Sequence, residues 1–213
     1  SDLHLNQGGV ETRSLRKNLP AYLRGLGIYC GYAFFTGDLR YAPAGRFSEN
    51  SMEQIREICD AVHTPIDHLF LVPGNHDVNR DAPGREEAVY RVHNAADQNH
   101  PGYYQPRTGT IKDDDLALIA AGRQDFCELI KTLYANVPER ADCYLNSSRP
   151  HFVLTSEDFN MIHLDSTLTY TKAQQQQLIV GINLLMDVLE QLDPTKPAVL
   201  LTHYSFDFLH RDE

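Results

Sequence analysis

The stretch HLFLVPGNHDVNR, residues 68–80, decides how this sequence folds. Its first five residues form a short apolar run with aromatic and β-branched side chains, which is typical of a buried strand. At Pro73 the run gives way to a turn-forming segment that carries Asn75, His76 and Asp77. Polar side chains directly after a buried strand indicate a site at the carboxyl end of a sheet.

Two further strand-like segments end in residues of the same chemistry. Residues 32–36 are followed by Gly37 and Asp38, and residues 198–202 are followed by His203. Near the N-terminus, Asp2 and His4 are two positions apart, and an extended backbone turns such residues to one face. Four separate segments therefore bring carboxylate, imidazole and amide groups to one rim, which predicts a metal site there.

Strand patterns alternate with helical patterns along the chain, which favours a layered α/β domain. We expect strands at 32–36, 68–72, 152–155, 160–164 and 198–202. We expect helices after a capping box of Ser51 and Gln54, from about 115 to 134, and after a second capping box of Thr171 and Gln174. The stretch at about 78–149 is interpreted as an excursion outside the main sheet with one long helix.

Length and composition narrow the class of protein. The 213 residues fit one domain with a core of its own. The net charge of −10 disfavours a protein that grips nucleic acid by bulk charge, although a local basic groove stays possible. The apolar runs are too short for a membrane span, no secretory signal pattern opens the chain, and the four cysteines form no C-x-x-C pair. We therefore expect a cytoplasmic protein without a membrane partner, and the oligomeric state stays open.

At these residues the sequence resembles the calcineurin-like metallophosphoesterases, a superfamily of phosphatases, cyclic-nucleotide phosphodiesterases and repair nucleases. The family pattern is D-x-H, G-D, G-N-H-D/E, a lone H and G-H-x-H. This chain supplies SDLH, FFTGDL, VPGNHDVNR and LTHYS in that order. The resemblance implies an α/β fold, the four-layer α/β/β/α sandwich with two packed mixed β-sheets flanked by helices, over residues 1–213. No motif explains the excursion at about 78–149.

The resemblance also implies a binuclear phosphoric ester hydrolase that attacks phosphodiester bonds with a metal-bridging hydroxide. In the family, the position of Asp38 bridges two divalent ions. Asp2 and His4 would complete the ligands of the first ion, and Asn75 and His203 those of the second. Mixed oxygen and imidazole ligands suit Mn best, with Fe or Zn as alternatives.

Three residues of the central motif would act on the substrate. In the family, the position of His76 faces the leaving group as general acid, and Asp77 would orient that imidazole and raise its pKa. A cap or turn role for Asp77 is the open alternative. Arg80 is a candidate to contact the substrate phosphate, or it is an exposed arginine without a role. The form GNHDVNR followed by an insertion resembles the phosphodiesterase and nuclease branches, so the expected substrate is a nucleic acid or a nucleotide.

The sequence departs from the family pattern at both ends. After His203 it offers no G-H-x-H, only His210, and no edge strand precedes Asp2. We therefore expect the chain to be part of a longer polypeptide. If these residues alone hold two ions, the candidates to replace the missing histidines are His151, His163 and His210. The alternative function is a degenerate phosphoesterase fold that acts as a protein-binding scaffold without catalysis.

Overall fold

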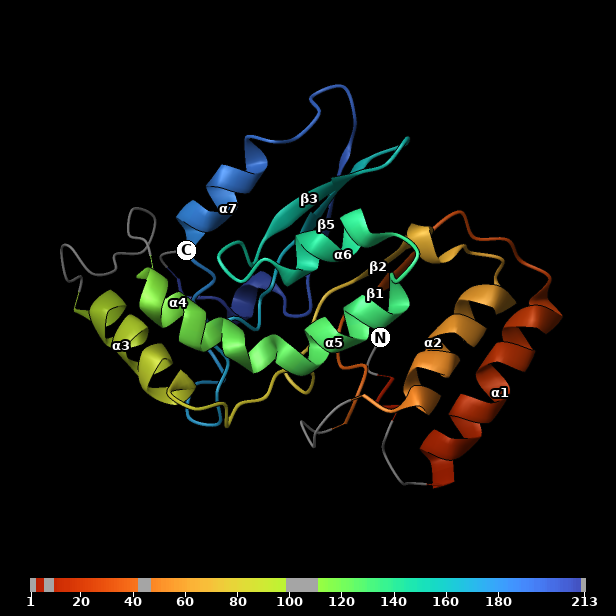
Figure 1. Ribbon diagram of the computed structural model, residues 1–213, viewed down its shortest axis with the longest axis horizontal. Coiled ribbons are helices and arrows are strands. Elements are labelled where there is room, and N and C mark those ends of the chain that lie inside the picture. Colours follow the sequence, from red (N-terminus) through yellow and green to blue (C-terminus); the bar gives the residue numbers. More distant parts are fainter. Residues whose placement is uncertain (1–2, 6–9, 42–46, 99–110, 212–213) are drawn as a thin grey trace.

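The computed structural model describes residues 3–5, 10–41, 47–98 and 111–211 (Figure 1). The helices and strands of this part are, in chain order, α1 (Val10–Leu26), β1 (Ala33–Phe35), α2 (Glu49–Ala61), β2 (Leu69–Leu71), α3 (Arg85–Asp97), α4 (Asp113–Ala120), α5 (Gln124–Leu133), α6 (Pro138–Leu145), β3 (Phe152–Thr155), β4 (Asn160–His163), α7 (Ile182–Leu189) and β5 (Ala198–Leu201). Short 3₁₀ turns lie at Ile66–His68, Ala121–Arg123 and Phe206–Phe208.

The strands form two small sheets. In one sheet β1 pairs with β2 in parallel, and Ala33 lies beside Leu69. In the other, β4 lies between β3, its antiparallel partner, and β5, its parallel partner. Each strand lies within the segment that the sequence predicted. The described part therefore has the mixed α/β architecture that was expected, with helices around two sheets.

Strand β2 is buried on both faces, and its side chains alternate between two cores. Leu69 and Leu71 point into a core shared with α2, α5 and α6. Phe70 packs in a second core with Met161 of β4 and Leu201 of β5, so this core lies between the two sheets. The period of two along an extended chain produces this division.

The outer edge of β2 is closed by side chains of the helical excursion. The Tyr134 hydroxyl donates to the Leu69 carbonyl at 2.8 Å, and the Leu71 amide donates to the Tyr144 hydroxyl at 3.2 Å. Arg140 also donates to the Leu69 carbonyl, at 3.2 Å. Figure 1 shows α5 and α6 in front of the strands. Backbone groups that a third strand would pair are thus satisfied by two tyrosines and an arginine.

The excursion differs from its prediction because residues 78–149 hold α3, α4, α5 and α6 instead of one long helix. The helix expected from 115 to 134 is interrupted at the 3₁₀ turn Ala121–Arg123. Gly122 in this turn lies against Arg85, and a Cβ on Gly122 would lie 2.6 Å from the Arg85 Nε. The buried side chain of Arg85 therefore passes close to the backbone at the point where the expected helix is interrupted.

Both predicted capping boxes are wrong. Helix α2 begins three residues earlier than expected, because the Ser48 hydroxyl accepts the Ser51 amide at 3.2 Å and acts as the cap. The Thr171 hydroxyl does accept the Gln174 amide at 2.9 Å, but this bond closes a turn. Helix α7 begins only at Ile182, after Gly181 with a φ of 77°. Helix α1 was not expected from the sequence.

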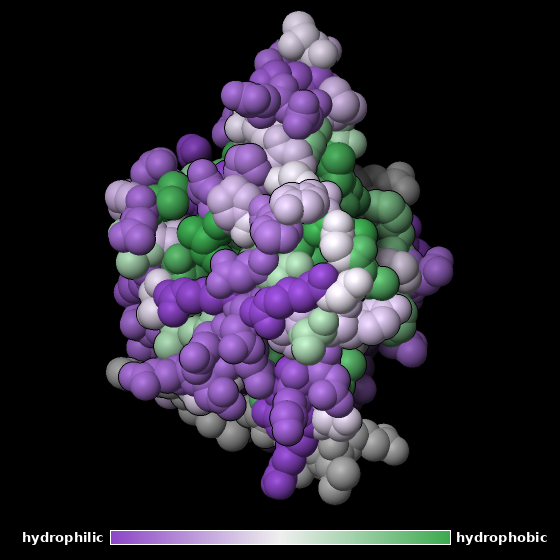
Figure 2. Space-filling view, turned by 90° about the vertical axis from the view of Figure 1, so that its right-hand side faces the viewer, coloured by the Kyte–Doolittle hydropathy of each residue, from purple (hydrophilic) through white to green (hydrophobic). Residues whose placement is uncertain are grey.

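The surface carries a mixture of polar and apolar residues. Figure 2 faces the end of the molecule where α1 and α2 lie, and hydrophilic residues dominate it with apolar patches between them. Among the described residues, no helix combines the length and apolar character that a membrane span requires. The four cysteines are free thiols.

Candidate metal centre

Two loops meet where the parallel strands β1 and β2 end, and two glycines allow the contact. A Cβ on Gly37 would lie 2.5 Å from the Gly74 amide nitrogen, and one on Gly74 would overlap Asp38 Oδ1. Asp38 itself has a φ of 52°, a left-handed conformation that costs energy for a residue with a side chain. The sequences GD and GN are therefore needed so that the loops can touch.

Asp38, Asn75 and His203 converge at this point. Asp38 is 4% exposed, and its Oδ1 accepts the His76 amide at 3.0 Å. The same oxygen lies 3.7 Å from His203 Nε2, which in turn lies 3.2 Å from Asn75 Oδ1. Three of the residues predicted from separate segments are thus brought together.

The tautomer of His203 leaves a lone pair at this meeting point. His203 Nδ1 lies 2.7 Å from the Thr36 carbonyl, which only accepts, so Nδ1 carries the proton. Neutral His203 therefore turns the lone pair of Nε2 toward two oxygens that are also acceptors. Imidazoles that bind metals commonly donate their other N–H to a carbonyl in this way.

The two separations around His203 Nε2 are close to those between ligands of one cation. Ligands about 2.1 Å from a tetrahedral ion lie roughly 3.4 Å from one another. The separations of 3.2 Å and 3.7 Å around His203 Nε2 bracket that value. One carboxylate oxygen, one amide oxygen and one imidazole nitrogen also form a mixed set that suits Mn, Fe or Zn.

His4 and Asp2 were predicted as ligands of another ion. His4 lies beside the group, because its amide donates to the Asp38 carbonyl at 3.1 Å and its ring meets the His76 ring edge-on at 5.2 Å. His4 Nδ1 donates to the Arg40 carbonyl at 3.3 Å, which leaves the lone pair on Nε2. Asp2 lies outside the described residues. Within the described ranges, no group of three or more His, Cys, Asp or Glu residues has a geometry that could hold a metal ion.

His76 lies at the rim of this site. Its Nε2 is 3.9 Å from Asp38 Oδ2, and its ring stacks on Tyr41 at 5.6 Å with an angle of 14°. Burial lowers the pKa of His76, and the Asp38 carboxylate opposes that effect. His76 Nδ1 has no hydrogen-bond partner, so no carboxylate holds this ring through that atom.

Asp77 therefore does not orient His76, and its contacts differ from those expected. Its carboxylate accepts backbone amides of Gly74 at 2.9 Å, Leu39 at 3.1 Å and Arg40 at 3.0 Å. Burial raises the pKa of Asp77 to about 6, against the effect of these three bonds. These contacts fit the turn role that the sequence left open for Asp77, because its carboxylate joins the loops that carry Asp38 and Asn75.

Arg40 strengthens the same junction. Its guanidinium donates to the carbonyls of His76 and Asp77, both at 3.0 Å, and to Asp125 of α5 at 3.1 Å. Arg40 was not predicted from the sequence. The only sequence signal is the place of Arg40 two residues after Asp38. Its burial, which explains why it is paired, is seen only in the structure.

Aromatic side chains lie beside the opposite wall of the site. Tyr204 meets the His203 ring at 4.7 Å and stacks on Tyr170 at 6.0 Å. Arg80, which was predicted to bind substrate, lies over the Tyr170 ring at 5.8 Å. Burial raises the pKa of Tyr204, so its hydroxyl stays protonated at neutral pH. Neither Tyr170 nor Tyr204 was predicted from the sequence.

The three histidines considered as replacements for the missing G-H-x-H ligands lie in other environments. His151 is held on both ring nitrogens, by the Val180 carbonyl at 2.7 Å and the Asp165 amide at 3.2 Å. His163 is buried between Phe152 and Tyr144, and neither of its ring nitrogens has a partner. His210 lies 3.8 Å from Asp97 at the end of α3. These contacts are all with residues other than the three that converge at the metal centre.

Comparison of the chain with protein-family models, with curated protein sequences and with solved structures finds no match. The resemblance of the sequence motifs to the metallophosphoesterases therefore stays a prediction.

Proposed function

We propose that this chain is a metal-dependent phosphoesterase domain that hydrolyses phosphodiester bonds of a nucleotide or nucleic acid. The observation that carries the proposal is the convergence of two oxygen acceptors on the His203 lone pair: His203 Nε2 lies 3.7 Å from Asp38 Oδ1 and 3.2 Å from Asn75 Oδ1. Such an arrangement is repulsive unless a cation or a proton lies between the atoms. The motif order supports the four-layer calcineurin-like sandwich as the finer fold.

The residues of the site would divide the binding of metal between them. Asp38, Asn75 and His203 would hold one divalent ion, while His4 and Asp2 would contribute to a second that shares Asp38. Mn is the preferred metal, with Fe or Zn as alternatives. Bound ions supply positive charge for the developing oxygens and a nucleophile at neutral pH.

The chain's own residues would position the diester and move the proton. The Arg80 guanidinium would bind a non-bridging phosphate oxygen, since arginine matches phosphate geometry. His76 would donate a proton to the leaving oxygen as general acid. Asp77 and Arg40 would act as positioning residues, because their contacts are with the backbone of the two loops.

Two tyrosines favour a substrate with a base. Tyr41 is 46% exposed and stacks on His76, and Tyr204 lies against His203 on the other side. A ring next to the phosphate site offers a stacking surface for a nucleobase, and such stacking tolerates any base. The net charge of −10 favours a small nucleotide over a long polyanion.

A catalytically silent scaffold is the second candidate. It is favoured by the contacts of Asp77 and Arg40, which bind the backbone of the two loops and would hold the loops in place without any catalytic step. Such a domain would keep the loops as a protein-binding surface.

The experiment combines metal binding with hydrolysis. Mn²⁺ binding to the full chain is measured by calorimetry, and hydrolysis of bis(p-nitrophenyl) phosphate is followed with and without EDTA. We expect Mn²⁺ binding and EDTA-sensitive hydrolysis, both lowered more than about 100-fold by Asp38→Asn, because losing a direct ligand costs more than losing its support. Asp187→Asn, on the exposed side of α7, is the matched control. Binding without hydrolysis would favour the scaffold, and hydrolysis that survives chelation would overturn the proposal.

The general acid is tested with a second variant. His76→Ala should keep Mn²⁺ binding and lower turnover roughly 10²–10⁴-fold. The loss of turnover should be smaller for a diester whose leaving group is p-nitrophenolate, which needs no proton to leave, than for a diester whose leaving group is an aliphatic alcohol. An equal loss with both leaving groups would contradict this role.

A further inference from the structure

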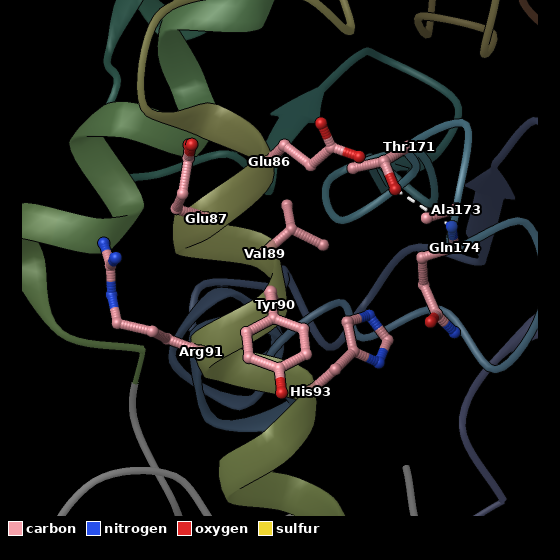
Figure 3. A pocket seen from close by; sticks show the side chains of 9 residues that line it. All are labelled: Glu86, Glu87, Val89, Tyr90, Arg91, His93, Thr171, Ala173 and Gln174. Carbon is pink, nitrogen blue, oxygen red and sulfur yellow. Dashed lines mark hydrogen bonds between the residues drawn. The ribbon is translucent and has the colours of Figure 1, made fainter.

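A second site lies away from the metal centre, in a pocket of about 610 Å³ between α3 and the turn that follows Tyr170 (Figure 3). Its volume lies within the range of about 300–1,000 Å³ that is usual for small-molecule sites. One stripe of α3 and the facing turn supply its lining, which includes Glu86, Val89, Tyr90, His93, Thr171 and Gln174. None of these residues belongs to the metal centre, so a ligand of this pocket would be independent of the proposed function.

His93 is the unusual residue of this pocket. It is 8% exposed, and its buried Nε2 has no hydrogen-bond partner. Burial lowers the pKa of His93 to about 4, although the Asp97 carboxylate opposes this, so the ring is neutral at physiological pH. A buried polar atom without a partner destabilises the folded protein, and this cost is removed when a ligand supplies the missing hydrogen bond.

Glu86 is a carboxylate acceptor in the lining of this pocket. Glu86 extends from α3 toward Thr171 in Figure 3. The Gln174 side chain donates one N–H to the Gln176 carbonyl, and its oxygen can accept a bond from a ligand. Tyr90 is 69% exposed, and its ring presents a negative face.

Two cations near the pocket are already paired in the described part of the chain. Arg91 donates to Asp115 through both Nε and Nη2, and Lys172 donates to Asp81 at 2.9 Å. Glu86 only accepts hydrogen bonds, so a ligand that binds it must bring hydrogen-bond donors, and beside a carboxylate it gains from a positive charge.

We propose that this pocket binds an organic cation, an amine or guanidinium carried on an apolar stem. The charged head would donate to Glu86 and to His93 Nε2, and its face would lie against the Tyr90 ring. The stem would pack on Val89 and Ala173, which give the pocket its apolar wall. The net charge of −10 favours the approach of such a ligand.

The test compares two probes of the same shape, n-butylguanidinium and the neutral N-butylurea. Binding to the full chain is followed by NMR, including the imidazole signals of His93. We expect n-butylguanidinium to bind with a dissociation constant in the millimolar range or tighter and to shift the Nε2 signal of His93. N-butylurea should bind at least about tenfold more weakly, because it lacks the charge-assisted bonds.

Two variants locate the site. Glu86→Gln should weaken n-butylguanidinium binding about tenfold. Glu190→Gln removes the same charge from an exposed position beyond α7 and should leave binding unchanged. An unchanged thermal unfolding midpoint shows that both variants stay folded. The proposal would be overturned if the two probes bind equally, or if butyrate, an anion of similar size, binds more tightly than n-butylguanidinium. It would also be overturned if Glu86→Gln has no effect, or if n-butylguanidinium does not bind at about 50 mM.

Discussion

The buried imidazole of His93 makes the stability of this protein sensitive to acid. In the unfolded chain a histidine has a pKa of about 6.5, whereas burial lowers the pKa of His93 to about 4 in the folded protein. Between these two values the unfolded chain takes up a proton that the folded protein does not. The contribution of His93 to the free energy of unfolding is therefore fully present above about pH 6.5 and is lost as the pH falls toward 4.

The size of the effect follows from the two pKa values. Lowering the pH from 7.5 to 5.0 should cost roughly 2 kcal/mol through His93 alone, and the complete loss well below pH 4 should approach about 3.4 kcal/mol. Asp97 and His210 are the charged neighbours that act on this ring. His151 and His163, whose pKa values burial also lowers, add to the acid sensitivity of the chain.

Urea unfolding at pH 7.5 and pH 5.0, followed by far-UV circular dichroism, measures the effect. His93→Gln cannot titrate, so its loss of stability between the two pH values should be roughly 2 kcal/mol smaller than that of the unmodified protein. This corresponds to about 1 M in the urea midpoint. His63→Gln, at an exposed ring stacked on Tyr29, is the control and should change the pH effect by less than about 0.5 kcal/mol. If unmodified protein and His93→Gln lose the same stability, the ring of His93 is not a buried neutral group.

Three further predictions concern other parts of the structure. Gly74→Ala should destabilise the fold by about 1–3 kcal/mol and abolish metal binding, because its Cβ would overlap Asp38; Gly25→Ala, with no atom within 4 Å of the new Cβ, should be neutral or slightly stabilising. Arg85→Met should lower the free energy of unfolding by about 3 kcal/mol or more, since it leaves the carbonyls of Leu168 and Tyr170 without their donor, whereas Arg56→Met at an exposed bond should cost under about 1 kcal/mol. Cys59 should resist thiol reagents until the protein unfolds, because it is buried and burial raises its pKa to about 12; rapid labelling of Cys59 in native protein would count against this.

The strands and the meeting of Asp38 with Asn75 could be predicted because they depend on local patterns. Short apolar runs form strands, and the parallel strands β1 and β2 end at one edge of their sheet. His203 follows β5 of the other sheet, so its approach depends on how the two sheets pack. The helix starts failed for a local reason as well. A hydroxyl that accepts the amide three residues later is found both in a helix cap and in an isolated turn, and Thr171 forms the turn.

The role of Asp77 could not be read from its position next to His76. The turn at Gly74 points the Asp77 carboxylate inward, where three backbone amides compete for it. Arg40, Tyr170 and Tyr204 were missed because their importance comes from contacts between distant segments. A pattern along the chain contains no information about which distant carbonyl a guanidinium will meet.

Arg85 has a consequence for the order in which the protein folds. Its guanidinium lies at the start of α3 but binds carbonyls of Leu168 and Tyr170, 83 and 85 residues later in the chain. Contacts over such separations form late, because closing a long loop costs chain entropy before any contact repays it. A nascent chain on the ribosome that has emerged only through α6 therefore holds a charged side chain without two of its three acceptors. Helices α3 and α4, which share a core with Leu168, should remain sensitive to protease until residue 170 has left the exit tunnel.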